Sequence, residues 1–231
     1  MGIFKINKDF KVFKSEVNWF LSPDSKIEFQ KQKEIRLSEE FKGTFPNLTK
    51  LILKSRATFL SIDTINYILF AWDTLDGKVC GWLNQQEAEQ EFKCELIQEH
   101  HLLLQNIGGI RESFNPPENS CSNNQNFMFI ASECSRGIGD YVNYYPTMCE
   151  EEGKHQIDYS TLLAFANEAN GALTMYDPKT KKVFLFSHDH CFENVEFMEN
   201  QPEYTFHTFK KVVIFEDYVE DLAKEWIEII K

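Results

Sequence analysis

Two short apolar runs, residues 172–176 and 183–186, constrain the fold of this chain more than any other feature. Asp177-Pro178-Lys179-Thr180 joins them, and Asn170-Gly171 precedes them as a second turn signal. Pro178 presets φ for the first inner position of a turn, while the Asp177 carboxylate can accept from backbone N–H groups two residues on. The stretch therefore predicts neighbouring antiparallel strands that form a β-meander.

The chain has enough apolar material for a sizeable core. It contains 231 residues, of which 42% are hydrophobic, and 21 of them are Phe. Nothing in this composition indicates disorder. We expect one domain over residues 1–231, with residues 1–83 as a candidate N-terminal elaboration.

The charge balance is strongly acidic. The formal net charge is −12, from 36 Asp and Glu against 24 Lys and Arg. Nucleic-acid binding needs clustered basic residues that contact phosphates, so the balance argues against a nucleic-acid partner. It favours a basic protein partner, although an acidic surface can equally serve only to keep the protein in solution.

The sequence also bears on compartment and on metal chemistry. No run approaches the roughly 20 apolar residues that span a bilayer, and the N-terminal MGIFKINKDFKVFK lacks the apolar core of a signal peptide. We therefore expect a cytoplasmic protein without membrane contact. Its six cysteines are scattered, with no CxxC pair, which predicts free thiols and no cysteine metal site.

Periodicity predicts two principal helices. Residues 85–107 contain neither Gly nor Pro, Asn84 is a suitable N-cap, and Gly108 is suited to the left-handed position after a helix. Residues 215–230 place apolar side chains on one face. A hairpin is expected across residues 74–78, in a region rich in β-branched and aromatic residues.

Two further segments are assigned from local pattern. The first forty residues mix Phe with Lys and Glu and are broken by Ser22-Pro23-Asp24, which indicates strand and loop. Residues 141–145, with three tyrosines and a valine, predict another strand.

The order of these segments resembles the SUKH superfamily, the cell-wall-regulator-like domain of many bacterial toxin-immunity proteins. The resemblance rests on Asn106-Ile107-Gly108-Gly109 at a helix end, on NGALTMYDPKTKKVFLFSHDH and on the terminal FEDYVEDLAKEW. It runs from about Glu87 to Trp226. In the meander, the turn acid, strand valine and trailing His-Asp of the family are matched by Asp177, Val183, His188 and Asp189.

The resemblance implies an α+β fold, with a twisted, mainly antiparallel meander sheet and packed helices. It also implies a non-enzymatic binding protein without a cofactor. Immunity members neutralise a secreted toxin, frequently a nuclease, by occluding its active site, and the acidic balance of this chain suits a basic toxin domain. The alternative is a regulatory or scaffolding protein that binds cell-envelope or signalling proteins.

Acidic residues around the meander and on the last helix are the candidate partner-binding residues. They are Asp177, Asp189, Glu193, Glu196 and Glu220.

His188-Asp189-His190 carries the competing chemical hypothesis. Residues i and i+2 of a strand share a face, so both imidazoles could reach one metal ion, with Cys191, Glu193 or His207 as a third ligand. That arrangement would suit a metal-dependent enzyme. A Cys191–His188 nucleophile pair is also conceivable, but catalysis needs a third, orienting group. A solvated turn explains the same residues, and we favour no metal site and no catalytic site.

Overall fold

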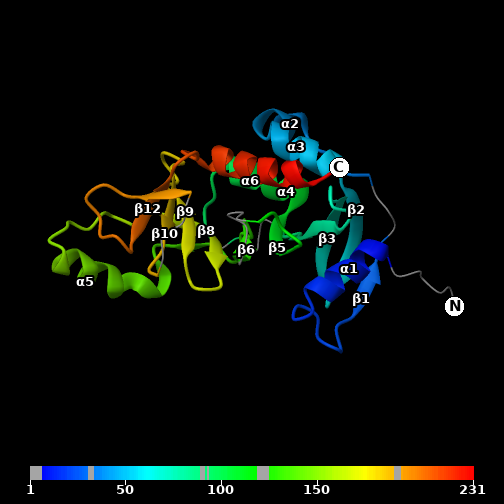
Figure 1. Ribbon diagram of the computed structural model, residues 1–231, viewed down its shortest axis with the longest axis horizontal. Coiled ribbons are helices and arrows are strands. Elements are labelled where there is room, and N and C mark those ends of the chain that lie inside the picture. Colours follow the sequence, from blue (N-terminus) through cyan, green and yellow to red (C-terminus); the bar gives the residue numbers. More distant parts are fainter. Residues whose placement is uncertain (1–6, 31–33, 89–91, 93, 119–124, 190–193) are drawn as a thin grey trace.

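The structure of the protein is a computed structural model (Figure 1). It describes residues 7–30, 34–88, 92, 94–118, 125–189 and 194–231.

A single twelve-stranded antiparallel sheet runs the length of the molecule. The strand order is β1-β2-β3-β4-β5-β6-β8-β9-β10-β12-β11, with β7 paired to β8. The strands are β1 (Ile27–Phe29), β2 (Arg56–Ile62), β3 (Ile65–Asp73), β4 (Val79–Gln85), β5 (Gly109–Phe114), β6 (Gln125–Met128), β7 (Ser135–Arg136), β8 (Leu163–Glu168), β9 (Leu173–Tyr176), β10 (Val183–Phe186), β11 (Val195–Phe197) and β12 (Phe206–Phe209).

The predicted meander is confirmed. β9 and β10 pair from Tyr176↔Val183 to Leu173↔Phe186. The Asp177 carboxylate accepts from the Lys179 amide at 2.8 Å, as the turn chemistry requires. The hairpin across residues 74–78 is also confirmed, because it joins β3 to β4.

Helices cover both faces of the sheet (Figure 1). α2, α3, α4 and α6 pack on one face, while α1 and α5 cover opposite ends of the other face. The helices are α1 (Lys8–Glu16), α2 (Glu39–Thr44), α3 (Pro46–Leu53), α4 (Gln98–Ile107), α5 (Tyr144–Glu151) and α6 (Phe215–Ile229), together with the 3₁₀ turn η2 (Gly139–Val142). The fold is α+β, as expected.

The last helix, α6, connects the two halves of the sheet. Near its C-terminus the Trp226 ring packs between Trp72 and Trp82, with centroid separations of 5.7 and 5.1 Å. Near its N-terminus Phe215 packs edge-on against Phe165 at 5.2 Å. Because β3 and β4 hold the two tryptophans and β8 holds Phe165, α6 lies across most of the sheet. Strands β1 to β4 therefore belong to the same sheet as the later strands, and α2, α3, β3 and β4 share a hydrophobic core with β8 and α6.

The predicted long helix is wrong at its start. Asn84 and Gln85 belong to β4, where they pair with β3 and β5, and the helix begins only at Gln98. Strand pairing with residues far away in the sequence overrides the helical pattern of this stretch. The predicted end is correct, since Gly108 adopts φ +76° directly after α4.

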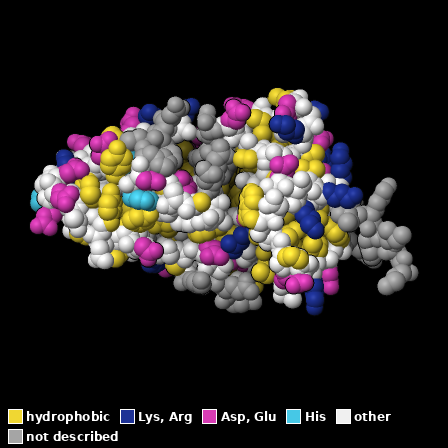
Figure 2. Space-filling view, turned by 60° about the horizontal axis from the view of Figure 1, so that its bottom comes forward, with side chains coloured by type: hydrophobic (Ala, Val, Ile, Leu, Met, Phe, Trp, Pro, Cys, Tyr) yellow, Lys and Arg dark blue, Asp and Glu magenta, His cyan; other side chains and the backbone are white. Residues whose placement is uncertain are grey.

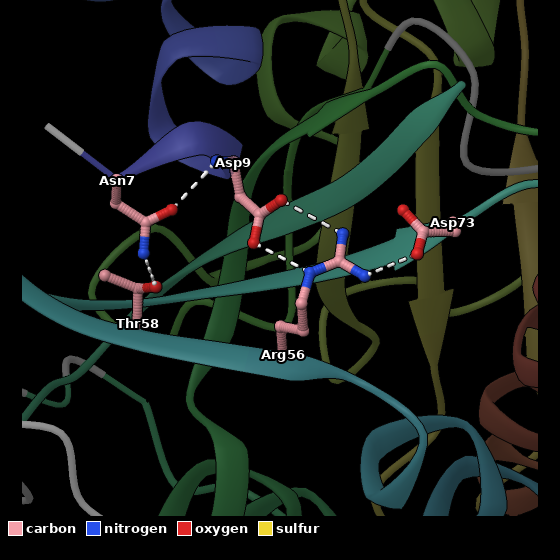
Figure 3. Close-up of polar contacts among 5 residues, drawn as sticks. All are labelled: Asn7, Asp9, Arg56, Thr58 and Asp73. Atoms are coloured by element: carbon pink, nitrogen blue, oxygen red, sulfur yellow. Dashed lines mark hydrogen bonds and ion pairs between the residues drawn. The ribbon is translucent and has the colours of Figure 1, made fainter. Parts of the chain in front are cut away.

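Of the first forty residues, for which strand and loop were expected, β1 is a strand, but residues 8–16 are helical instead. Phe10, Phe13 and Val17 are buried on one side of α1, against the sheet. The Asn7 side chain caps α1 by accepting from the Asp9 amide at 2.8 Å, and its amide group donates to Thr58 at 2.6 Å (Figure 3). The sequence signal was the spacing of the three apolar residues, which is helical.

Residues 141–145 form no strand. The segment is the end of η2 followed by the first residues of α5, in which Tyr145 and Cys149 are buried one turn apart. Tyrosines are frequent in strands, but here the spacing of buried residues follows the helix.

Candidate partner-binding surface

Asp177 and Asp189, two of the acids around the meander, lie apart. Asp177 stabilises its own turn, because its second carboxylate oxygen accepts from the Thr180 hydroxyl at 2.9 Å. Asp189 is exposed, and Asn170 donates to it at 3.3 Å. Since Asp177 precedes β10 and Asp189 follows it, the two carboxylates lie at opposite ends of that strand.

Of the two remaining acids near the meander, the structure describes Glu196. Glu196 is exposed in β11, the strand at the edge of the sheet, where it pairs with Thr208. Glu193 lies outside the described residues. The exposed positions of Asp189 and Glu196 leave both accessible to a partner, but on different strands.

Glu220 has a structural role. Its carboxylate accepts from the backbone amides of Asn47 and Leu48 at 2.9 and 3.1 Å, and from the Asn47 side chain at 2.7 Å. These donors are at the start of α3. Glu220, which lies in α6, therefore accepts hydrogen bonds from the N-terminal N–H groups of a neighbouring helix.

Of the histidines in the competing metal hypothesis, the structure describes His188 and His207. His188 is partly buried with its ring 4.8 Å from that of Tyr141, whereas His207 is fully buried and lies 3.1 Å from the Thr205 carbonyl oxygen. Burial lowers the pKa of His207. His190 and Cys191 lie outside the described residues. Among the residues that the structure does describe, no three His, Cys, Asp or Glu are grouped so as to hold a metal ion.

Acidic side chains are numerous along α6, but its N-terminal half uses them within the molecule. Glu216 and Glu99 both contact the Lys181 ammonium, at 3.0 and 2.5 Å. Asp217 accepts from the Ile214 amide at 3.2 Å. These carboxylates fix α6 to the β9–β10 turn and to α4.

The acids of α6 from Asp221 onward line two surface hollows. Glu225 and Glu228 line both of them, and Asp221 lines one. The larger hollow, here called the hairpin groove, has a volume of about 540 Å³. Its lining residues are Thr74, Leu75, Asp76, Lys78, Asn115, Pro116, Pro117, Glu118, Glu225, Glu228 and Ile229.

The walls of the hairpin groove are held in place by the backbone. The Leu75 amide donates to the Ile229 carbonyl at 2.8 Å, and the Lys231 amide donates to the Asp73 carbonyl at 3.0 Å. These two hydrogen bonds hold residues 229–231 against the hairpin. On the other wall the Asn115 side chain donates to the Val79 carbonyl at 2.9 Å. The groove is thus preorganised, which lowers the entropic cost of binding.

The second hollow has a volume of about 410 Å³ and a balanced charge. Asp221, Glu225 and Glu228 are matched there by three lysines, Lys210, Lys211 and Lys224. The hairpin groove, by contrast, has four carboxylates and one lysine. Glu225 and Glu228 line both hollows, so the hairpin groove is the more acidic of the two because Asp76 and Glu118 join them there opposite a single lysine.

Charge is unevenly distributed elsewhere on the surface. On the face shown in Figure 2, Asp and Glu side chains are dispersed, while Lys and Arg gather toward the right-hand end, where α1 and β1 lie. Among the described residues drawn on this face, the acidic side chains gather in no single patch.

The fold places the chain in the α+β class, with one long helix crossing an antiparallel sheet. No family model, curated protein or solved structure matches it. In the described part of the chain, every helix is too short or too polar to cross a membrane.

Sequence reasoning missed the hairpin groove. Its residues come from three stretches, 74–78, 115–118 and 225–229, that only the folded chain brings together. One signal was present: Leu75 is a large apolar residue inside a predicted turn, where polar residues are usual.

Proposed function

We propose that this protein is a non-enzymatic, cytoplasmic binding protein of the immunity type, which neutralises a basic toxin domain by covering its active site. The observation that carries the proposal is the set of three carboxylates along α6, Asp221, Glu225 and Glu228, beside two hollows. The resemblance to SUKH immunity proteins supports the same function.

Electrostatics supports a basic partner. Carboxylates on a surface with net charge −12 raise the rate of encounter with a cationic protein and disfavour anionic ones. The helix that carries them is immobilised by Trp226, whose ring is buried between two other tryptophans. A rigid helix face can bind without a large ordering cost.

The experiment is partner capture with matched charge reversals. Tagged protein is purified from its native host at low and at high salt, and co-purifying proteins are identified by mass spectrometry. The test variant carries Asp221→Lys, Glu225→Lys and Glu228→Lys. The control carries Glu150→Lys, Glu151→Lys and Glu152→Lys, which changes charge equally at three exposed positions in and just after α5, on the other face of the sheet.

We expect the wild-type protein and the α5 control to retain a basic partner that high salt weakens, and the α6 variant to lose it. Retention of that partner by the α6 variant contradicts the proposal. Recovery only of cell-envelope or signalling proteins instead favours a regulatory or scaffolding role, which is the second candidate function.

A further inference from the structure

We infer that the hairpin groove binds an extended, cationic protein segment in which a Lys or Arg stands next to an apolar residue. The inference rests on the proposed function, because it assigns to the same partner the segment that enters this groove. It adds which kinds of side chain the groove binds and which residues of the groove contact them.

The charge of the groove selects a cationic occupant. Asp76, Glu118, Glu225 and Glu228 line it together with a single lysine, Lys78. The Lys78 ammonium lies 3.3 Å from Asp76, so it compensates that carboxylate, while Glu118 and Glu228 add negative charge to the lining. The remaining excess of negative charge disfavours nucleic acid and a second copy of this chain, whose net charge is −12.

The groove also offers an apolar contact. The Leu75 side chain is 66% exposed although its backbone is fixed by the hydrogen bond to Ile229. Pro116 and Ile229 line the same hollow. Leu75, Pro116 and Ile229 together give the groove an apolar part, and the burial of that surface on association is favourable.

The size of the groove fits a short segment of chain. Its volume of about 540 Å³ lies within the range of roughly 300–1,000 Å³ usual for ligand sites. Two or three residues of an extended segment fill such a volume. An apolar contact beside several carboxylates favours an occupant that is both apolar and cationic over a simple metal ion or an unbranched polyamine.

The test uses a random dodecapeptide library displayed on phage and selected on the intact protein. We expect enriched sequences that pair Lys or Arg with Leu, Ile, Phe or Trp. The most enriched sequence is then synthesised, and its affinity is measured by fluorescence anisotropy at low and at high salt.

Groove variants are Leu75→Asp and Glu228→Lys, and matched controls are Val142→Asp and Glu151→Lys. Val142 is 49% exposed in η2 and Glu151 is exposed in α5, so both controls make the same chemical change far from the groove. We expect each groove variant to weaken the peptide at least about tenfold and each control to leave it within about twofold. No enrichment, enrichment of acidic or uncharged peptides, or equal binding by the groove variants overturns the inference.

The same variants separate this inference from the proposed function. If Leu75→Asp abolishes peptide binding and weakens the captured partner as well, the inference is supported. If peptide binding is lost while capture of a basic, toxic partner is unchanged, the groove is not part of the partner surface, and the inference fails although the proposed function stands. If peptides bind the groove but the host yields no basic partner, the proposed function fails and the chemistry assigned to the groove stands.

Discussion

The carboxylate of Glu220 lies 2.9 Å from the backbone amide nitrogen of Asn47, although 173 residues separate the two in the sequence. Asn47 is in the first turn of α3, and Phe45, which precedes that helix, has no polar side chain to cap it. Glu220 therefore supplies from α6 the cap that α3 lacks, and it couples the two helices.

Replacement of Glu220 tests this cap. We expect Glu220→Ala to lower the free energy of unfolding by about 1–2 kcal/mol, because helix-terminal amides lose their acceptor in a partly buried site. Glu220→Gln keeps an acceptor oxygen and should cost less. Urea denaturation measures both, with the exposed Glu228→Ala as the control. A Glu220→Ala variant as stable as the control would contradict the cap.

The tryptophan cluster makes a second prediction. Trp226 is fully buried against Trp72 and Trp82, so Trp226→Ala removes a large side chain at the point where α6 meets the N-terminal strands. We expect a loss of about 3–5 kcal/mol. Leu53→Ala is the control, since that side chain is 61% exposed and its loss should change stability by less than about 0.5 kcal/mol. Equal midpoints in thermal denaturation for the two variants would argue against α6 as the bridge between the halves.

The attachment of α1 gives a local prediction. Buried Asp9 accepts from Arg56 at two positions, 2.9 and 3.0 Å, and Arg56 also donates to Asp73 at 2.9 Å (Figure 3). Asp9→Asn breaks the paired contact, and we expect α1 amides to exchange hydrogen about tenfold faster while α6 amides change little. Exchange is read by mass spectrometry.

Asp24→Asn is the control for that experiment, because Asp24 is exposed in the loop after α1. Unchanged exchange of α1 in the Asp9→Asn variant would show that apolar packing alone holds the helix.

The pH dependence of stability tests the environment of His100. Its ring lies 2.8 Å from the Phe129 carbonyl oxygen and 3.3 Å from the Tyr176 hydroxyl, and complete burial lowers its pKa to about 4. The unfolded chain, with an imidazole pKa of about 6.5, binds more protons between these values. Stability from this group is therefore present above pH 6.5 and is lost as pH falls toward 4.

His100→Gln removes that titration. Between pH 7 and pH 5 we expect the wild-type protein to lose about 2 kcal/mol more than the variant, as measured by urea denaturation at each pH. Parallel pH profiles would contradict this, because they would show that folding leaves the pKa of His100 unchanged.

Local chemistry made the meander and the last helix predictable. Asp177 and Pro178 fix their turn through backbone geometry, and the apolar face of α6 repeats over fifteen residues. The start of α4 was not predictable in this way. Asn84 and Gln85 are strand residues only because β3 and β5 lie beside them, and those pairings involve residues far away in the sequence.

The candidate surface was only partly predictable. Acids on α6 were expected to matter, but the sequence does not say that Glu220 faces α3 while Glu228 faces a groove. That difference depends on which side of the helix packs on α3, a tertiary relationship. The hairpin groove depends likewise on the hydrogen bond from Leu75 to Ile229, which no local pattern encodes.

The central claim is that the protein neutralises a toxic partner by binding it through Asp221, Glu225 and Glu228 of α6. The most direct measurement is growth of cells that express the captured partner together with this protein. We predict that the wild-type protein and the Glu150→Lys, Glu151→Lys, Glu152→Lys control restore growth, and that the Asp221→Lys, Glu225→Lys, Glu228→Lys variant, expressed at the same level, does not. Restored growth with the α6 variant, or a partner that does not impair growth by itself, would contradict the account.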